Sequence, residues 1–401
     1  MKSAFKSNKR NQDIWIYFMS KAQIFIGIKR FVTLLHTFKF LLLLILPLLF
    51  MSMERQNPTI KKEKAFVAYT KDSVILEVDL IFNSEAEPIK YYSNVVTPVC
   101  EEGVCYNLVA EVYWDLLGNF MDYKETALDP LTKFDHIKFT REDHDKMKEI
   151  LRDKTSLLAN YKAEDLVDHS IEIKSEVIDG VAGATYKSLS GAVVRGAVYS
   201  SHTLWHIVNG EVADKIVAHT ESLMNDDLLI WMLDSDNYNL QFYALNKIDT
   251  GNEQYTPNLI RLISEGNSYV PFFAIEKIPE WAWSSALYQP KIIILLKEVE
   301  FRMQNEILNK LNDRELEENS ITVLTSSMES LNKSQLKKAF NILNNNRDRL
   351  SVESIGEIES LSESGNKEIS EAAEQFLTSL EKEGGLVSKK MKEHRKKLIS
   401  N

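Results

Sequence analysis

Two stretches, LIWMLDSDNYNLQFYALNKI (Leu229–Ile248) and LIRLISEGNSYVPFFAIEKI (Leu259–Ile278), align without gaps at an offset of 30 residues. The matched positions include Ala244 with Ala274 and Lys247 with Lys277. A repeat of this length, with a small residue inside its second half, is typical of two-helix units whose alanine lets neighbouring helices approach closely. Because one helix pair cannot bury its apolar face alone, the repeat predicts a stack of helix pairs.

Looser copies of the same pattern begin at Ile292, Gln335 and Ile369. Together the copies resemble HEAT-like repeats, and this resemblance implies an all-α helical-repeat (HEAT-like solenoid) domain over residues 213–385. The remaining residues, 386–401, form a basic tail that we interpret as a solvated helix end. Elsewhere the chain is acidic, with a net charge of −10 over 401 residues. This charge argues against nucleic acid as a partner.

The N-terminal region carries the uncharged run FLLLLILPLLFMSM (Phe40–Met53), which is preceded by Lys29, Arg30 and Lys39. Its length suits a secretory signal, and the basic residues before it favour export of the rest of the chain. We therefore predict that residues 1–53 are a signal peptide or an N-terminal membrane anchor. The protein is then extracytoplasmic, in the periplasm or cell envelope.

The two cysteines, Cys100 and Cys105, flank the short turn EEGV, and apolar and polar residues alternate on both sides of it. This pattern predicts a β-hairpin whose cysteines come within disulfide distance. In an exported chain a structural disulfide is favoured over a redox pair or free thiols. Two cysteines are too few for a thiolate zinc site.

Residues 54–212 have the pattern of an α+β domain. Strands are expected from about 60 to 125, with a tight turn at Gly118-Asn119. A capped helix is expected to begin after Thr140, because Glu142 and Asp143 follow it and apolar residues recur at helical spacing. A further strand near residues 171–177 and a long helix from about Tyr186 to Asn209, ended by Gly210 as its C′ residue, complete the domain.

Between that last strand and the long helix lies the loop DGVAGAT (Asp179–Thr185). Gly180 and Gly183 let the backbone turn its N–H groups toward one point, and a helix N-terminus would add partial positive charge beside the Thr185 hydroxyl. The residues alone leave two interpretations open: a phosphate-binding loop and an ordinary helix-initiating turn.

The same loop resembles the flavinylation motif of the FMN-binding domain found in the NqrC and RnfG subunits of ion-pumping redox complexes. This resemblance implies that Thr185 accepts FMN through a phosphoester bond made by a flavin transferase of the ApbE type. Asp179, Gly183 and Ala184 match the other fixed positions, whereas Ala182 stands where the family has Ser or Thr. Gly180, Lys187 and Ser188 would lie near the phosphate.

Other side chains offer weaker candidates for the same region. Aromatic residues that could lie over the isoalloxazine ring are Tyr186, Trp205, Tyr199 and Trp114, although such residues are more often part of a core. His202 and His206, four residues apart, can share a metal or simply pack, and no acidic third ligand is placed beside them. Lys133 is a candidate charge partner for the ligand, and the alternative is that its loop is an ordinary solvent-exposed segment.

The sequence thus predicts an α+β FMN-binding-like domain followed by helical repeats. Its expected function is extracytoplasmic electron transfer, as a flavoprotein that presents FMN to a redox partner rather than as a self-contained enzyme. The alternative is a non-catalytic exported scaffold whose FMN-binding-like domain is degenerate and whose repeats bind another protein.

Overall fold

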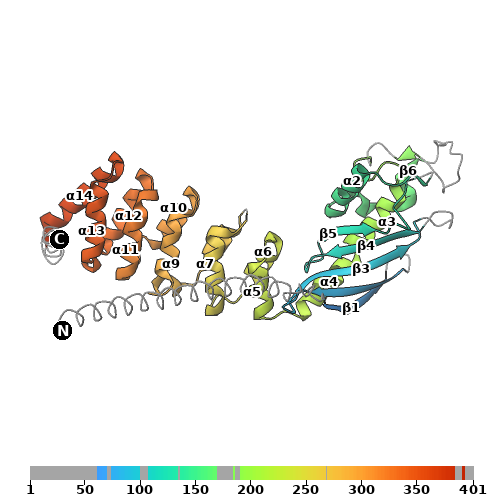
Figure 1. Cartoon of the computed structure of the whole chain (residues 1–401), viewed down its shortest axis with the longest axis horizontal. Coiled ribbons are helices and arrows are strands. Elements are labelled where there is room, and N and C mark those ends of the chain that lie inside the picture. Colours follow the sequence, from blue (N-terminus) through green and yellow to red (C-terminus); the bar gives the residue numbers. More distant parts are fainter. Residues whose placement is uncertain are drawn as a thin grey trace, which may run out of the picture. The chain divides into compact units, whose positions relative to one another are not determined.

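The computed structural model describes residues 61–69, 74–99, 107–133, 136–168, 184–185, 190–267, 269–383 and 391–392. A five-stranded antiparallel sheet comes first in the chain, and a mostly helical region of twelve helices, α3 to α14, follows among the described residues (Figure 1). This order confirms the coarse prediction of strands followed by helices. The predicted strand near residues 171–177 and the basic tail, apart from residues 391–392, lie outside the described residues.

The sheet is a simple meander in which each strand pairs with the next one along the chain. Apolar residues alternate with polar ones in β2 to β4, so one face of the sheet is buried and the other is exposed to solvent. The strands are β1 (Lys61–Tyr69), β2 (Ile75–Phe82), β3 (Pro88–Thr97), β4 (Leu108–Trp114) and β5 (Phe120–Glu125).

The hairpin predicted around the cysteines is confirmed as a pairing of strands. β3 and β4 run antiparallel, from Tyr91 opposite Trp114 to Thr97 opposite Leu108. Cys100 and Cys105 themselves lie outside the described residues, so their disulfide stays a prediction.

The turn between β4 and β5 is held by one buried carboxylate. Gly118 has a φ of +67°, as the sequence predicts, whereas Asn119 is not among the described residues with positive φ. Asp115, which is 4% exposed, accepts hydrogen bonds from the backbone N–H groups of Leu117 at 2.8 Å and Asn119 at 2.9 Å. This turn therefore satisfies its own backbone donors in the way Asx turns do.

The helix predicted after Thr140 is confirmed as α2 (Arg141–Arg152), which begins with a capping box. The Thr140 Oγ1 accepts from the Asp143 N–H, and the Asp143 Oδ2 accepts from the Thr140 N–H at 2.8 Å. Met147, Ile150 and Leu151 form its buried face against the sheet domain.

We expect Thr140→Ala to lower the local free energy of unfolding of α2 by about 1 kcal/mol, because an orphan N–H donor loses its acceptor. Hydrogen exchange of the α2 amides measures this loss. Thr140→Ser keeps the acceptor and should retain most of the protection. Equal losses in both variants would contradict the capping role.

The long helix predicted from about Tyr186 is wrong over residues 190–197. α3 spans only Val198–Asn209, and residues 190–197 form turns. The reason is Gly196, whose φ of +80° cannot occur inside a right-handed helix. The predicted end at Asn209 is correct, but Gly210 has a φ of −92° instead of a left-handed C′ conformation, and α4 begins directly after it.

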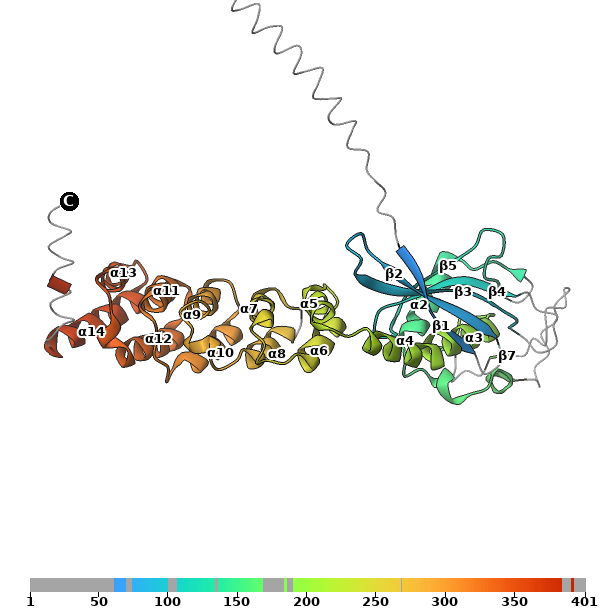
Figure 2. The ribbon, with the colours of Figure 1, turned by 90° about the horizontal axis from the view of Figure 1, so that it is seen from below.

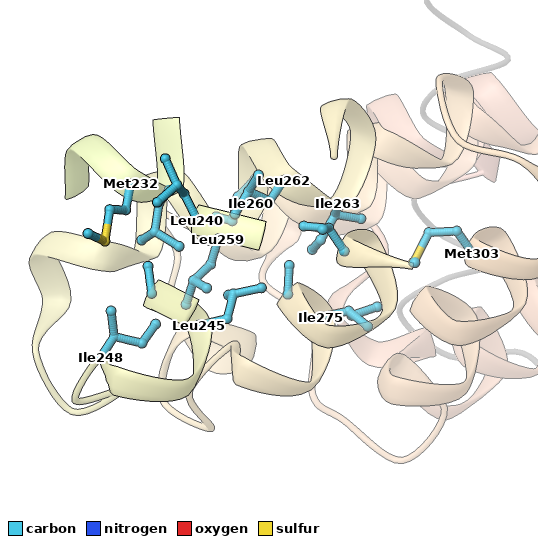
Figure 3. Close-up of a cluster of buried hydrophobic side chains, with 14 of the residues drawn as sticks. Met232, Leu240, Leu245, Ile248, Leu259, Ile260, Leu262, Ile263, Ile275 and Met303 are labelled. Carbon is cyan, nitrogen blue, oxygen red and sulfur yellow. The ribbon is translucent and has the colours of Figure 1, made fainter. Parts of the chain in front are cut away.

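The two aligned sequence repeats each form two helices, as predicted: α5 and α6 for the first, α7 and α8 for the second. Ala244 and Ala274 are both fully buried, which agrees with their predicted packing role. The buried side chains of α5 to α10 meet in one apolar cluster (Figure 3). The helices are α3 (Val198–Asn209), α4 (Glu211–Ser222), α5 (Asp226–Asp234), α6 (Tyr238–Lys247), α7 (Thr256–Glu265), α8 (Val270–Lys277), α9 (Gln289–Ile293), α10 (Phe301–Leu311), α11 (Glu318–Ser327), α12 (Lys333–Asn345), α13 (Val352–Ser362) and α14 (Lys367–Glu383).

The helices from α5 onward contact one another in two rows (Figure 2). In one row the even-numbered helices contact one another in sequence, from α6 through α8, α10 and α12 to α14. In the other, α5 contacts α7, and α11 contacts both α9 and α13. Each row thus joins segments about one sequence repeat apart, as expected if the repeat unit is a helix pair.

Candidate functional site

The predicted FMN motif is described only at its last two residues. Ala184–Thr185 form the short strand β7, which pairs antiparallel with β6 (Val167–Asp168) so that Thr185 lies opposite Val167. Asp179, Gly180, Gly183, Lys187 and Ser188 lie outside the described residues. The motif's threonine therefore lies in a two-stranded ladder that is anchored to the rest of the domain.

This placement corrects one part of the phosphate-site argument. The sequence predicts Thr185 at the N-terminus of the long helix, where the helix dipole would favour an anion. It lies instead in β7, and α3 begins thirteen residues later, at Val198. Thr185 is therefore not the residue at which the long helix begins.

One face of α3 fixes the chain that leads into β6. Four of its polar side chains, at spacings of three and four residues, donate to backbone carbonyls of residues 151–161. These bonds are His202 Nε2 to Tyr161 O at 2.8 Å, Trp205 Nε1 to Asp153 O at 2.9 Å, His206 Nε2 to Leu158 O at 3.0 Å and Asn209 Nδ2 to Leu151 O at 3.0 Å.

The two histidines of this face have a structural role. A carbonyl oxygen only accepts hydrogen bonds, so His202 and His206 both present a protonated Nε2 to it. The Nε2 atom of each histidine is therefore not available to coordinate a metal ion. Among the described residues, no group of three or more His, Cys, Asp or Glu side chains is placed to hold a metal.

The aromatic candidates of the sequence fall mostly in the core. Trp114 is fully buried, and its Nε1 donates to Val208 O at 2.9 Å. Trp205 is 5% exposed, and its Nε1 donates to Asp153 O at 2.9 Å. Tyr199 is half-buried, and Tyr186 lies outside the described residues. The two indoles thus join the sheet and α2 to α3, which is a packing role.

Lys133, a predicted charge partner for a ligand, instead pairs with the cap of α2. Its Nζ lies 2.8 Å from Asp143 Oδ2. Burial by itself raises the pKa of the Asp143 carboxyl, but the Lys133 ammonium and the Thr140 N–H together hold that pKa below its ordinary value.

A buried polar cluster that the sequence did not reveal joins the sheet to α4. The Tyr91 hydroxyl lies 2.9 Å from His219 Nδ1 and 2.9 Å from Thr220 Oγ1, and Phe66 packs against both rings. Burial raises the pKa of Tyr91 to about 12, against the opposing effect of the Thr220 hydrogen bond, and burial lowers the pKa of His219. The predicted domain boundary at residue 212 falls within α4, whose C-terminal turn makes these contacts.

This cluster predicts a pH dependence of stability. Because the folded-state pKa of His219 is lowered, the unfolded chain binds the proton more readily, so stability falls as pH drops through the ordinary value near 6.5. We expect the urea midpoint to fall less in His219→Gln than in the unsubstituted protein between about pH 7.5 and about pH 5.5. Equal pH slopes for the two proteins would show that His219 does not contribute.

The same sheet is tied to the first helix pair by the buried carboxylate of the β4–β5 turn. Asn237, the N-cap of α6, donates from Nδ2 to Asp115 Oδ2 at 3.2 Å. The two residues are 122 positions apart, so no local pattern in the sequence indicates the contact.

No protein-family model matches the chain, and neither a curated protein nor a solved structure shows significant similarity to it. Within the part of the chain that the structure describes, every helix is too short or too polar to span a bilayer.

Proposed function

We propose that this protein is a docking scaffold in which α5 to α14 form a HEAT-like solenoid. The observation that carries the proposal is the continuous row of even-numbered helices, in which each helix contacts the one about a repeat away. Such rows present side chains at regular intervals over a long surface, which is the property that repeat proteins use to bind other proteins.

Repeated ion pairs between successive helix pairs support the same proposal. Arg314 forms an ion pair with Glu280, and Arg349 forms the equivalent pair with Glu315, 35 residues further along. Arg314 also lies 5.5 Å from the centre of the buried Trp283 ring. The same ion pair thus recurs after 35 residues, which is close to the repeat length. This recurrence indicates that successive helix pairs pack against each other with similar geometry.

Buried amides reinforce the junctions between repeats. Gln289, which is fully buried, donates to the carbonyls of Trp283 and Glu315 at 2.7 and 3.1 Å and accepts from the Glu317 N–H at 2.9 Å. Satisfied buried amides favour one specific arrangement over alternatives. The stack is therefore suited to hold its surface in a fixed geometry.

Site-specific photo-cross-linking in the native host tests this function. A cross-linking amino acid is placed at one exposed position on each of several helices, and at Lys124 on the sheet as a comparison. We expect adducts with the same partner protein at a contiguous subset of helical positions. Failure to form a protein adduct at any helical position would contradict the scaffold. The helical positions are Asn246, Asn309, Lys337 and Glu374.

A second candidate function is the presentation of covalent FMN at Thr185 for extracytoplasmic electron transfer with a redox partner. It is supported by the match of Asp179–Thr185 to the flavinylation motif and by the β6–β7 ladder that anchors the motif's threonine. An oxidising compartment, reached through the 1–53 segment, would also suit a Cys100–Cys105 disulfide.

Co-expression with an ApbE-type flavin transferase tests this candidate. Mass spectrometry of the purified protein should reveal an FMN adduct that is lost in Thr185→Ala. Ala182→Ser, which restores the hydroxyl of the family motif, should raise the adduct yield. Absence of both covalent and bound flavin from protein isolated from its native host would rule the candidate out and leave the scaffold function standing.

A further inference from the structure

Three successive even-numbered helices begin with an exposed aromatic side chain. Tyr238 at the start of α6 is 49% exposed, Tyr269 before α8 is 70% exposed and Phe301 at the start of α10 is 54% exposed. They are 31 and 32 residues apart, so they recur at the repeat length. Together with Phe242 and Phe273, one turn further along α6 and α8, they define what we call the aromatic strip.

Contacts between the helices bring these ends together. The Asn267 side chain donates to Asp236 O at 3.3 Å, which joins the segments that precede α8 and α6. The Phe242 and Phe273 rings meet edge to face with centroids 4.9 Å apart.

The same neighbour relation extends to α10. The helices α8 and α10 contact each other, and Lys310 near the end of α10 pairs with Glu276 near the end of α8 at 2.9 Å. Tyr269 and Phe301 lie at the N-terminal ends of these two contacting helices. The aromatic strip therefore crosses three adjacent helices.

Packing within the stack does not account for this exposure. In the described part of the helical region, all large apolar side chains that are strongly exposed occur at or before Phe301. Helices α11 to α14 belong to the same rows without any such residue. Grouped exposed aromatics on part of a repeat array are typical of a binding surface.

The charges beside the strip are mainly acidic. Asp236, Glu298 and Glu300 are exposed, lie one to three residues before Tyr238 or Phe301, and have no ion-pair partner among the described residues. Lys297 and Arg302, in the same segment as the two glutamates, offset two of the three, which leaves one net negative charge beside the strip. Exposed ring faces and unpaired carboxylates both attract lysine and arginine side chains.

We infer that the aromatic strip docks a segment of another protein that combines basic with apolar side chains. The apolar side chains would cover the rings of Tyr269, Phe273 and Phe301, and the cations would meet the carboxylates of Asp236, Glu298 and Glu300. The inference rests on the proposed scaffold function and names the surface and the partner chemistry.

Benzoylphenylalanine placed at position 269 or 301 of the full chain, in its native host, tests this inference. We expect both positions to cross-link to one partner, within a segment that carries Lys or Arg beside apolar residues. Lys337→benzoylphenylalanine on α12, where the row lacks exposed aromatics, is the control and should give little adduct. The double reversal Glu298→Lys/Glu300→Lys should reduce the adduct at position 269 at least about fivefold.

The remaining outcomes would overturn the inference. These are an adduct in an acidic or uncharged segment, cross-linking to a second copy of this chain or to lipid, and an adduct yield that the charge reversal leaves unchanged. Adducts at Lys337 with none at positions 269 and 301 would refute the aromatic strip while the scaffold function stands. Absence of protein adducts at every helical position would instead refute the scaffold itself.

Discussion

Gly118→Ala is expected to lower the local free energy of unfolding of the sheet by about 3 kcal/mol. Alanine at a φ of +67° costs about 1–2 kcal/mol, because its Cβ crowds the following carbonyl. A Cβ there would also lie only 2.6 Å from the carbonyl oxygen of Ala213 in α4. Since this neighbour is helix backbone, relieving the overlap displaces either the turn or α4 and adds an overpacking cost.

Hydrogen exchange of the β4 and β5 amides measures this loss, because local opening energies can be read element by element. Gly191→Ala is the matched control: its added Cβ would meet no atom within 4 Å, and its φ is not positive. The control should leave protection unchanged within about 0.5 kcal/mol. Similar losses in both variants would show that the close approach to Ala213 is not what requires glycine.

Asn346→Leu should lower the free energy of unfolding of the helical region by about 3 kcal/mol, because it leaves several buried backbone groups unpaired. Asn346, which is 4% exposed, accepts from the Leu316 N–H at 2.7 Å and donates to the carbonyls of Arg314 at 3.0 Å and Ile342 at 2.9 Å. It thus links α12 to the segment before α11.

Hydrogen exchange of α11 and α12 and the urea midpoint of the helical region measure the effect. Asn341→Leu, within α12 and five residues before its C-cap Asn346, is the matched control. Its side chain is exposed and donates only to the Asn312 Oδ1 at 3.1 Å, so it should change stability by less than about 0.5 kcal/mol. If the two leucine variants were equally destabilised, the buried network would not be the cause.

The β4–β5 turn that contains Gly118 is connected to the proposed docking surface through its packing contacts. The Asp115–Asn237 hydrogen bond joins the β4–β5 turn to the start of α6, where Tyr238 begins the aromatic strip. The packing of Gly118 on α4 adds a second contact at the same turn.

The elements that the sequence predicted correctly are those with a strong local signal. Apolar alternation identified β2 to β4, the Thr140 capping box identified the start of α2, and the 30-residue offset identified two helix pairs with buried Ala244 and Ala274. Each signal works because burial of one face fixes a period of two or about 3.6 residues. The same periodicity misjudged residues 190–197, where apolar spacing continues but Gly196 takes a left-handed conformation.

The candidate site was predictable only as a motif. Asp179–Thr185 could be singled out by its glycines and its resemblance, but the sequence placed Thr185 at a helix terminus, and the structure places it in β7 opposite Val167. A strand of two residues has too few positions to show a period, so its pairing partner is set by the surrounding packing. The Tyr91–His219–Thr220 cluster escaped prediction because its members are 128 and 129 residues apart.

By itself the sequence determined that strands precede helices, that the helices come in pairs about 30 residues apart, and which residues face the core, since burial imposes a local period on the chain. Only the tertiary structure decided that the exposed aromatic residues at the starts of α6, α8 and α10 belong to helices that contact one another in turn. It also decided that the buried Asp115 carboxylate accepts a hydrogen bond from the N-cap of α6. Such contacts depend on the register between distant elements, which is set by the summed packing of both surfaces and leaves no periodic trace along the chain.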